Sequence, residues 1–230
     1  MLEITLGTWQ ISLKRTSISG EDLSRMYDKA SNFWHSSVNS LGFMSAYEDL
    51  FQTLFKEKKI LTKQDQCKVL DIGIGTGALS LQLLKNAKNP LEIYGLDLSE
   101  KMLMKAKENF KGYAVKFFLK AGNAKNLPYP NSSFNFVMNA HLIEHSENPI
   151  EEIREMVRVS KKNSPILIIT TKPNMISEFH SLRWRYDIIK VEKLIQSMKD
   201  VGMKNIQRYS LSKKRLVPNY LSEVFIGYKK

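Results

Sequence analysis

The stretch VLDIGIGTGALS, residues 69–80, carries an apolar strand pattern into a turn with three glycines, and a helix pattern begins directly after it. A second apolar run, residues 91–96, ends on Asp97. Glycine lets the backbone turn sharply and lets a ligand approach closely. An acid about twenty residues after such a turn can accept hydrogen bonds from ribose hydroxyls. The pattern therefore predicts a nucleotide-cofactor site at the first crossover of a parallel sheet.

The glycine pattern alone leaves the cofactor open, because Gly73-x-Gly75-x-x-Ala78 also fits the dinucleotide pattern. Asp71 stands just before the turn, where dinucleotide folds usually carry an apolar residue. Glycines at 73, 75 and 77 suit a small amino-acid ligand better than a pyrophosphate. Both features weigh against a dinucleotide.

Two further segments carry a resemblance to a known family. Residues 120–129 read KAGNAKNLPY, and residues 133–139 read SFNFVMN. With the glycine turn, they resemble the class I S-adenosylmethionine-dependent methyltransferases of the small-molecule type, a methyltransferase type 11-like group, from about Tyr27 onward. The resemblance implies S-adenosyl-L-methionine as cofactor and S-adenosyl-L-homocysteine as product, with no metal.

The resemblance also implies which residues hold the cofactor. They are Tyr27, Asp71, Gly73, Ile74, Gly75, Gly77, Asp97, Leu98, Met102, Asn123, Ala124 and Asn139. The turn would hold the methionine part, Asp97 the ribose, and Asn123 the adenine edge. The family usually has Asp where Asn123 stands, and the amide carbonyl can still accept from an exocyclic amine. Simpler roles stay open: a tight turn for the glycines and a helix cap for Asp97.

Apolar runs alternate with helical patterns along the core, which predicts an α/β fold. We expect a doubly wound, Rossmann-like sheet of seven strands, mostly parallel with the last strand antiparallel, and helices on both faces. The expected strands lie near residues 68–72, 92–96, 115–119, 134–139, 165–171, 205–211 and 222–229. The expected core helices lie near residues 78–87, 99–109, 149–160 and 188–201.

Three parts are expected along the chain. Residues 1–20 alternate apolar and polar side chains, which predicts a β-strand leader that covers a sheet edge or pairs with another subunit in a homodimer. Residues 21–66 show helical spacing of aromatic side chains and predict a helical lid. Residues 67–230 would form the core, with an insertion near 172–187 above the substrate pocket.

The segment after the fourth core strand should face the active site, because ligands of such sheets lie beyond the carboxyl ends of the strands. It contains His141 and His145, the predicted catalytic residues. An imidazole near its free pKa can accept a proton from a hydroxyl or an acidic carbon. His145 could instead only brace the loop. An amine or thiol acceptor would need no base, because the sulfonium of the cofactor is already activated and positioning suffices.

Aromatic and basic side chains of the lid and the insertion are the predicted substrate contacts. They are Trp34, Arg183, Trp184 and Arg185. Two arginines flanking a tryptophan can clamp a carboxylate or a phosphate. Alternatively, Trp34 and Trp184 are core residues and the arginines lie at the surface.

Composition narrows the classes of protein. The net charge is +12, and residues 151–230 hold 17 Lys and Arg against 8 Asp and Glu. Such a surface can attract nucleic acid, an anionic membrane or a phosphorylated substrate, but scattered lysines favour a solvated surface. The sequence has no apolar run long enough to span a membrane and no signal-peptide pattern at residues 1–4. The single cysteine, Cys67, indicates a reducing compartment, so a cytoplasmic location is expected.

The favoured function is methyl transfer to O, N or C of a small molecule by in-line displacement. The alternatives are a methyltransferase acting on RNA or protein, a non-catalytic binding module and a nicotinamide-dependent oxidoreductase. Nucleic acid is not favoured, because Asn-Ala-His-Leu at 139–142 replaces the Asn/Asp-Pro-Pro-Tyr/Phe motif of amino-directed nucleic-acid enzymes. The presence of Asp71 and Asp97 weighs against a non-catalytic module that has lost its cofactor site. Asp71 also weighs against a nicotinamide-dependent oxidoreductase.

Overall fold

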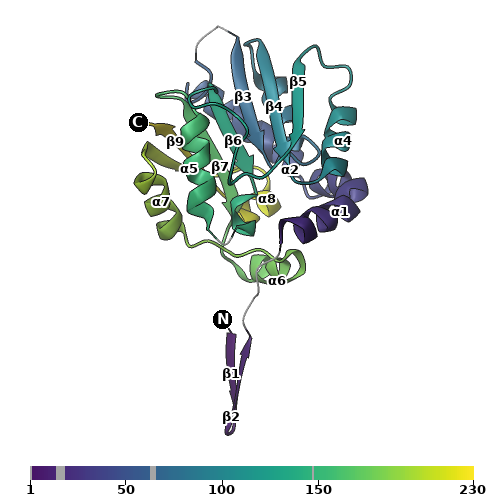
Figure 1. The fold of residues 1–230 in the computed structure, drawn as a ribbon, viewed down its shortest axis with the longest axis vertical. Helices are drawn as coiled ribbons and strands as arrows, with labels where there is room; N and C mark the ends of the chain where they lie inside the picture. The colour runs from purple at the N-terminus through teal and green to yellow at the C-terminus, as the bar shows by residue number, and fades with distance from the viewer. Residues whose placement is uncertain (1, 14–18, 63–65, 147) are drawn as a thin grey trace.

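The computed structural model describes residues 2–13, 19–62, 66–146 and 148–230. A single sheet of seven strands forms its centre (Figure 1). The strands are β3 (Cys67–Ile72), β4 (Leu91–Asp97), β5 (Lys116–Ala121), β6 (Phe136–Ala140), β7 (Pro165–Thr171), β8 (Met203–Tyr209) and β9 (Ser222–Lys229). All seven predicted strands form, with bounds within two residues of those expected.

The order across the sheet is β5-β4-β3-β6-β7-β9-β8. Strands β3 to β7 run parallel, and β9 runs antiparallel to both β7 and β8. The predicted fold class is therefore confirmed, including the antiparallel last strand. The order reverses between β3 and β6, so the carboxyl ends of β3, β4 and β6 meet at the switch point where such sheets bind ligands.

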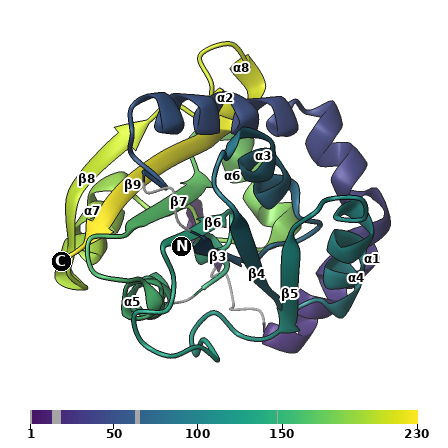
Figure 2. The ribbon, with the colours of Figure 1, turned by 90° about the horizontal axis from the view of Figure 1, so that it is seen from above.

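Helices cover both faces of the sheet (Figure 2). The longer helices are α1 (Gly20–Ser40), α2 (Phe43–Lys56), α3 (Ala78–Asn86), α4 (Glu100–Asn109), α5 (Pro149–Val159), α6 (Met175–Trp184) and α7 (Val191–Asp200). The four predicted core helices correspond to α3, α4, α5 and α7. The segments η1 (Ile143–His145) and α8 (Leu216–Leu221) are short.

Strand β3 shows how the two layers form. Its side chains alternate between the faces, so Val69 joins the core cluster that contains residues of α2 and α3. Leu70 and Ile72 join the cluster that contains residues of α5 and α7. All three are at most 1% exposed, as expected for a parallel strand covered on both faces.

The N-terminal leader forms a hairpin of β1 (Leu2–Leu6) and β2 (Trp9–Leu13). Gly7, at φ +61°, opens the two-residue turn between Leu6 and Trp9, as tight hairpin turns require. Within the described part of the chain, the hairpin pairs only with itself, and β5 and β8 remain the edges of the main sheet. The predicted strands form, and within the described ranges they pair with each other and not with an edge of the main sheet.

The two helices of the predicted lid pack differently. Helix α2 buries Tyr47, Leu50 and Phe51 in the main core. Helix α1 instead lies against the start of α4, where Ser24 Oγ donates to the carbonyl of Leu98 at 3.0 Å. Thus α1 covers the carboxyl ends of the strands, and α2 belongs to a layer of the core.

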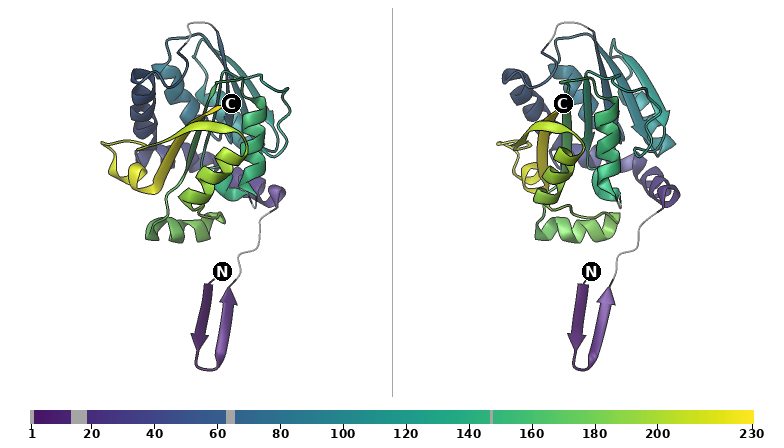
Figure 3. Two further views of the ribbon diagram at one scale, coloured as in Figure 1. Left: turned by 90° about the vertical axis from the view of Figure 1, so that its left-hand side faces the viewer. Right: turned by 60° about the vertical axis from the view of Figure 1, so that its left-hand side comes forward.

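The insertion folds into helix α6, which was not predicted as a helix. Asn174 caps it, because its Oδ1 accepts a hydrogen bond from Ser177 N at 2.9 Å. Figure 3 shows α6, in green, crossing below the sheet at the end that also carries α1. The predicted position of the insertion above a substrate pocket stays a prediction.

Candidate active site

A cavity of about 450 Å³ lies beyond the carboxyl ends of β3, β4, β6 and β7, between α1 and α6. Twelve predicted site residues line it. They are Tyr27, Trp34, Asp71, Gly73, Ile74, Gly75, Asp97, Leu98, Met102, His141, His145 and Trp184. Two ends can be distinguished by the roles predicted for their residues: a cofactor end around Asp97, where the cofactor is predicted to bind, and an acceptor end around His141, the predicted base. The remaining wall is mainly apolar.

Six predicted residues do not line the cavity: Gly77, Asn123, Ala124, Asn139, Arg183 and Arg185. Asn139 lies inside β6 with a fully buried side chain, and its Nδ2 points to Met156 Sδ at 3.3 Å. Ala124 packs in the core cluster. Asn123 Oδ1 accepts from Lys125 N at 2.9 Å. Their predicted contacts with the cofactor therefore have no support in this geometry.

Gly77 belongs to the turn but packs against Phe110 and does not line the cavity. A Cβ at this position would lie 2.6 Å from Cζ of Phe110, and its φ is +83°. Glycine is therefore required by packing and by backbone conformation, whether or not a ligand touches it. Arg183 and Arg185 have exposed side chains outside the cavity. The guanidinium of Arg183 lies 5.5 Å from the ring of Trp184.

Asp97 organises the cofactor end. Its Oδ2 accepts from Gly75 N at 2.8 Å, and its Oδ1 accepts from Ser99 N at 2.9 Å. Burial raises the pKa of this carboxyl, while these backbone N–H groups oppose the shift. Each oxygen keeps capacity for a further hydrogen bond. The group therefore matches two adjacent hydroxyls of a ribose.

The glycine turn is held between two loops. Gly73 has a φ of +70°, and a Cβ there would lie 2.9 Å from Cδ1 of Leu142. Behind the turn, Asp71 is buried, and Ser80 Oγ donates to its Oδ2 at 2.6 Å. Burial raises the pKa of Asp71 to about 7. Gly75 has open space on the cavity side, where a Cβ would meet only Trp34 Nε1 at 3.9 Å among side-chain atoms.

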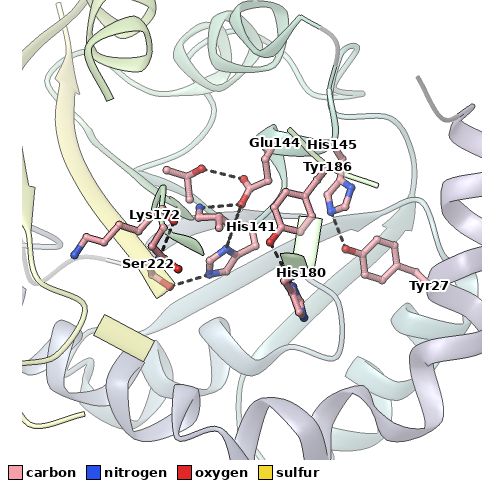
Figure 4. Close-up of polar contacts among 11 residues, drawn as sticks. Tyr27, His141, Glu144, His145, Lys172, His180, Tyr186 and Ser222 are labelled. Carbon is pink, nitrogen blue, oxygen red and sulfur yellow. Dashed lines mark hydrogen bonds and ion pairs between the residues drawn. The ribbon is translucent and has the colours of Figure 1, made fainter. Parts of the chain in front are cut away.

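His141 and Glu144 form a pair at the acceptor end (Figure 4). His141 Nδ1 lies 3.2 Å from Glu144 Oε1, which also accepts from N and Oγ1 of Thr171 at 3.0 and 2.8 Å. Burial opposes ionisation of Glu144, but hydrogen bonds from His141 and Thr171, together with the charge that the two histidines carry when protonated, outweigh it and lower its pKa. An ionised carboxylate only accepts, so Nδ1 of His141 carries the proton. In the neutral ring, Nε2 is then the acceptor nitrogen, and Ser222 Oγ donates to it at 3.2 Å.

His145 lies in a different environment. Its Nε2 is 2.8 Å from the hydroxyl of Tyr27. Burial lowers the pKa of His145 to about 4, so its ring is neutral at physiological pH. Burial also raises the pKa of Tyr27, which keeps its hydroxyl protonated and able to donate. The pair links η1 to α1 across the cavity, consistent with the bracing role considered for His145.

Aromatic rings join α1 to α6. The rings of Tyr27 and Trp184 stack with centroids 5.8 Å apart, and Trp34 meets both edge-on at 5.3 and 5.2 Å. Offset and edge-to-face pairs of this kind each contribute about 0.5–1.5 kcal/mol beyond burial. The side chains predicted to contact substrate therefore also hold the lid against the insertion.

Several site residues were missed by sequence reasoning. Glu144 and Thr171 complete the His141 site, and Ser222 reaches it from β9. His180 and Tyr186 lie on the cavity wall, 3.3 Å apart at Nδ1 and the hydroxyl (Figure 4). Glu144 could have been predicted from the sequence, because an acid three residues after His141 is close enough along the chain to pair with it. No local pattern marks Ser222, which is 81 residues away from its partner.

Two negative findings concern only the described part of the chain. No group of three or more His, Cys, Asp or Glu side chains there is arranged to hold a metal ion. None of the described helices is both long and apolar enough to cross a membrane.

Comparisons with known proteins identify the class of the core. Residues 70–168 match the family model described as a methyltransferase domain. Ajmaline N-methyltransferase from Rauvolfia serpentina is 32% identical over 104 residues, which cover 44% of this chain and 35% of that enzyme. A demethylmenaquinone methyltransferase from Anoxybacillus flavithermus is 25% identical over 167 residues, which cover 72% of this chain and 69% of that enzyme.

A solved structure shows the same fold. The [4+2]-cyclase SpnF superposes with a TM-score of 0.71 at 14% identity, covering 93% of this chain and 97% of that chain. The matches together support the resemblance to the class I S-adenosylmethionine-dependent methyltransferases, and residues 70–168 match a methyltransferase domain. The alignments span about one third and two thirds of the two methyltransferases' own lengths. Because one neighbour is named a cyclase, the fold alone does not define the reaction.

Proposed function

We propose that this protein transfers a methyl group from S-adenosyl-L-methionine to O, N or C of a small molecule and releases S-adenosyl-L-homocysteine. The observation that carries the proposal is one continuous cavity, with Asp97 and the glycine turn at one end and His141 with Glu144 at the other. Its volume lies in the range of small-molecule sites. A cofactor and an acceptor bound in such a cavity would be neighbours.

The cofactor end fits S-adenosyl-L-methionine by the chemistry of its side chains. Asp97 would accept from the ribose hydroxyls, and Leu98 and Met102 offer apolar contact to a flat base. The backbone from Gly73 to Gly75 would lie against the methionine part. When bound, the cofactor supplies a methyl group on a sulfonium, so the protein's main task is to position the acceptor and exclude water.

His141 is the proposed general base for an oxygen or carbon acceptor. Its Nδ1 proton is held by Glu144, so Nε2 can accept a proton from an acceptor hydroxyl that takes the place of Ser222 Oγ, which lies 3.2 Å away. Glu144 acts as a positioning residue, because it fixes the tautomer and orientation of the ring. His145 is a weaker choice, because burial lowers its pKa to about 4 and Tyr27 occupies its Nε2.

The test is methyl transfer from cofactor labelled on the methyl group. Purified protein would be incubated with a panel of phenols, acidic carbon compounds, amines and thiols, and separately with total RNA and total protein. We expect label in a small molecule and an equal yield of S-adenosyl-L-homocysteine, both lost in Asp97→Ala. Label confined to RNA or protein would instead support the alternative acceptor class. Failure of folded protein to bind either sulfur ligand would refute both.

A further inference from the structure

The outward face of α6 is apolar. Met175, Phe179 and Leu182 lie on one side of this helix and are 88%, 81% and 66% exposed. The side turned inward instead carries the buried Ser177 and Ser181. This arrangement reverses the usual pattern of a surface helix, in which apolar side chains face the core. Burying the outward face against another apolar phase would therefore be favourable.

A second exposed apolar group lies on α8. Leu216, Val217 and Tyr220 are 82%, 50% and 50% exposed. Helix α8 is tied to the start of α6, because Asn174 Nδ2 donates to the carbonyl of Tyr220 at 3.0 Å. We call these six side chains of α6 and α8 the apolar rim.

The apolar rim borders the cavity. Ile176 of α6 lines the cavity wall and is itself 58% exposed, so it connects the wall to the outer surface. Leu221 at the end of α8 also lines the cavity. The apolar wall of the cavity and the apolar rim therefore form neighbouring surfaces.

Basic side chains flank the apolar rim. Arg183 lies at the end of α6 and Arg185 directly after it, and Lys213, Lys214 and Arg215 directly precede α8. All five are exposed, and none forms an ion pair with another residue in the described ranges. The exposed acids nearby are Glu178 and Asp187. The border therefore carries a positive surplus, which complements an anionic surface.

We propose that the apolar rim docks on an anionic lipid bilayer. The exposed side chains of α6 and α8 would enter the boundary between headgroups and acyl chains, and the flanking basic residues would meet lipid phosphates. A flat anionic bilayer matches an apolar surface with a basic border better than a second copy of this basic chain, which would bring like charges together. The docked protein would turn the cavity toward the lipid. This binding does not depend on the proposed chemistry.

The first test is co-sedimentation with vesicles of phosphatidylcholine, with or without phosphatidylglycerol. We expect the wild type to sediment with the anionic vesicles and the double variant Phe179→Glu/Leu182→Glu to lose at least about tenfold in affinity, because two apolar side chains no longer enter the lipid. Met104→Glu is the matched control, because Met104 is 64% exposed on α4, outside the apolar rim. Thermal unfolding would confirm that each variant folds.

A charge-reversal pair tests the basic border. Lys213→Glu/Lys214→Glu should weaken binding to anionic vesicles, whereas Lys85→Glu/Lys88→Glu, at two exposed lysines at the end of α3 and just after it, should weaken it less. Equal binding by wild type and the Phe179→Glu/Leu182→Glu variant, or no binding by the wild type, would overturn the proposal. Light scattering would reveal a dimer that dissociates in that double variant, and this result would assign the apolar rim to a second copy instead.

Discussion

The two ends of the cavity are built in different ways. At the cofactor end, Asp97 binds the backbone N–H groups of Gly75 and Ser99, and β3 and β4 pair in parallel register through Asp71 and Gly95. At the acceptor end, side chains from α1, η1, α6 and β9 meet over long sequence separations. Backbone contacts within a sheet leave little freedom, whereas helices packed through side chains can shift. The comparison indicates a rigid cofactor end and an acceptor end whose shape depends on helix packing.

The largest expected effect lies at the acceptor end. His141→Gln should lower kcat for an oxygen or carbon acceptor by about 10²–10⁴-fold, the range for losing a general base. Glu144→Gln should also lower kcat with little change in KM, because it leaves the ring present but without its charged partner. Steady-state kinetics with a hydroxyl acceptor measures both.

His145→Gln is the matched control for His141. Because burial lowers the pKa of His145 to about 4 and Tyr27 bonds its Nε2 at 2.8 Å, we expect a much smaller loss of kcat than for His141→Gln. An amine or thiol acceptor should also be less sensitive to loss of His141, since it needs no base. Equal losses for the two histidine variants with a hydroxyl acceptor would contradict the assignment of His141 as the base.

The rigidity of the cofactor end can be tested with two glycines. Gly77 and Gly112 both have a positive φ, but only Gly77 has a neighbour, Phe110, within 4 Å of an added Cβ. Gly112→Ala should cost about 1–2 kcal/mol of unfolding free energy for backbone conformation alone. Gly77→Ala should cost about 2–5 kcal/mol, because overpacking against the Phe110 ring adds to it. Urea unfolding of the two variants measures both losses of unfolding free energy. Equal losses would contradict the prediction and would mean that the Phe110 ring moves aside.

The buried carboxyl of Asp71 predicts a pH dependence of stability. Burial raises its pKa to about 7 in the folded protein, above the value near 4 of an unfolded chain. The folded state therefore holds an extra proton between these values, and its contribution to stability falls as pH rises through about 7. Asp71→Asn stays neutral, so its unfolding free energy relative to wild type should be higher at pH 8 than at pH 5, by on the order of 2 kcal/mol.

Urea unfolding of wild type and Asp71→Asn at the two pH values measures this difference. Taking the difference between the two proteins removes the contributions of other titrating groups such as Glu152, whose pKa burial raises to about 8. A free-energy difference that does not change with pH would mean that Asp71 titrates as an ordinary carboxyl.

The cofactor end could be predicted from the sequence because one continuous stretch, residues 69–97, contains both strands, the turn and the acid. The strand bounds followed from apolar runs that parallel strands require. The acceptor end could not be predicted in this way. Tyr27 meets His145 across 118 residues, and Ser222 meets His141 across 81, so these contacts depend on how helices and strands pack in space.

Helix α6 was missed for a different reason. Its apolar residues at 175, 176, 179 and 182 follow helical spacing, and Asn174 is a good cap, so a local signal existed. The expected insertion near 172–187 nevertheless carried no predicted secondary structure. Its apolar face points away from the core, so the usual expectation that the apolar face of a helix packs on the core does not hold for α6.

Asp97 and the glycine turn are proposed to bind the nucleoside and methionine parts of S-adenosyl-L-methionine. Calorimetric titration of the wild type and Asp97→Ala with S-adenosyl-L-methionine, S-adenosyl-L-homocysteine and NADH tests this proposal most directly, with circular dichroism to confirm folding. We expect the wild type to bind both sulfur ligands with micromolar affinity. In Asp97→Ala the affinity should fall by about 100-fold or more, because two charge-assisted hydrogen bonds to the ribose are lost. Absence of sulfur-ligand binding to folded wild type, with NADH bound instead, would contradict the account and move the protein to the oxidoreductases.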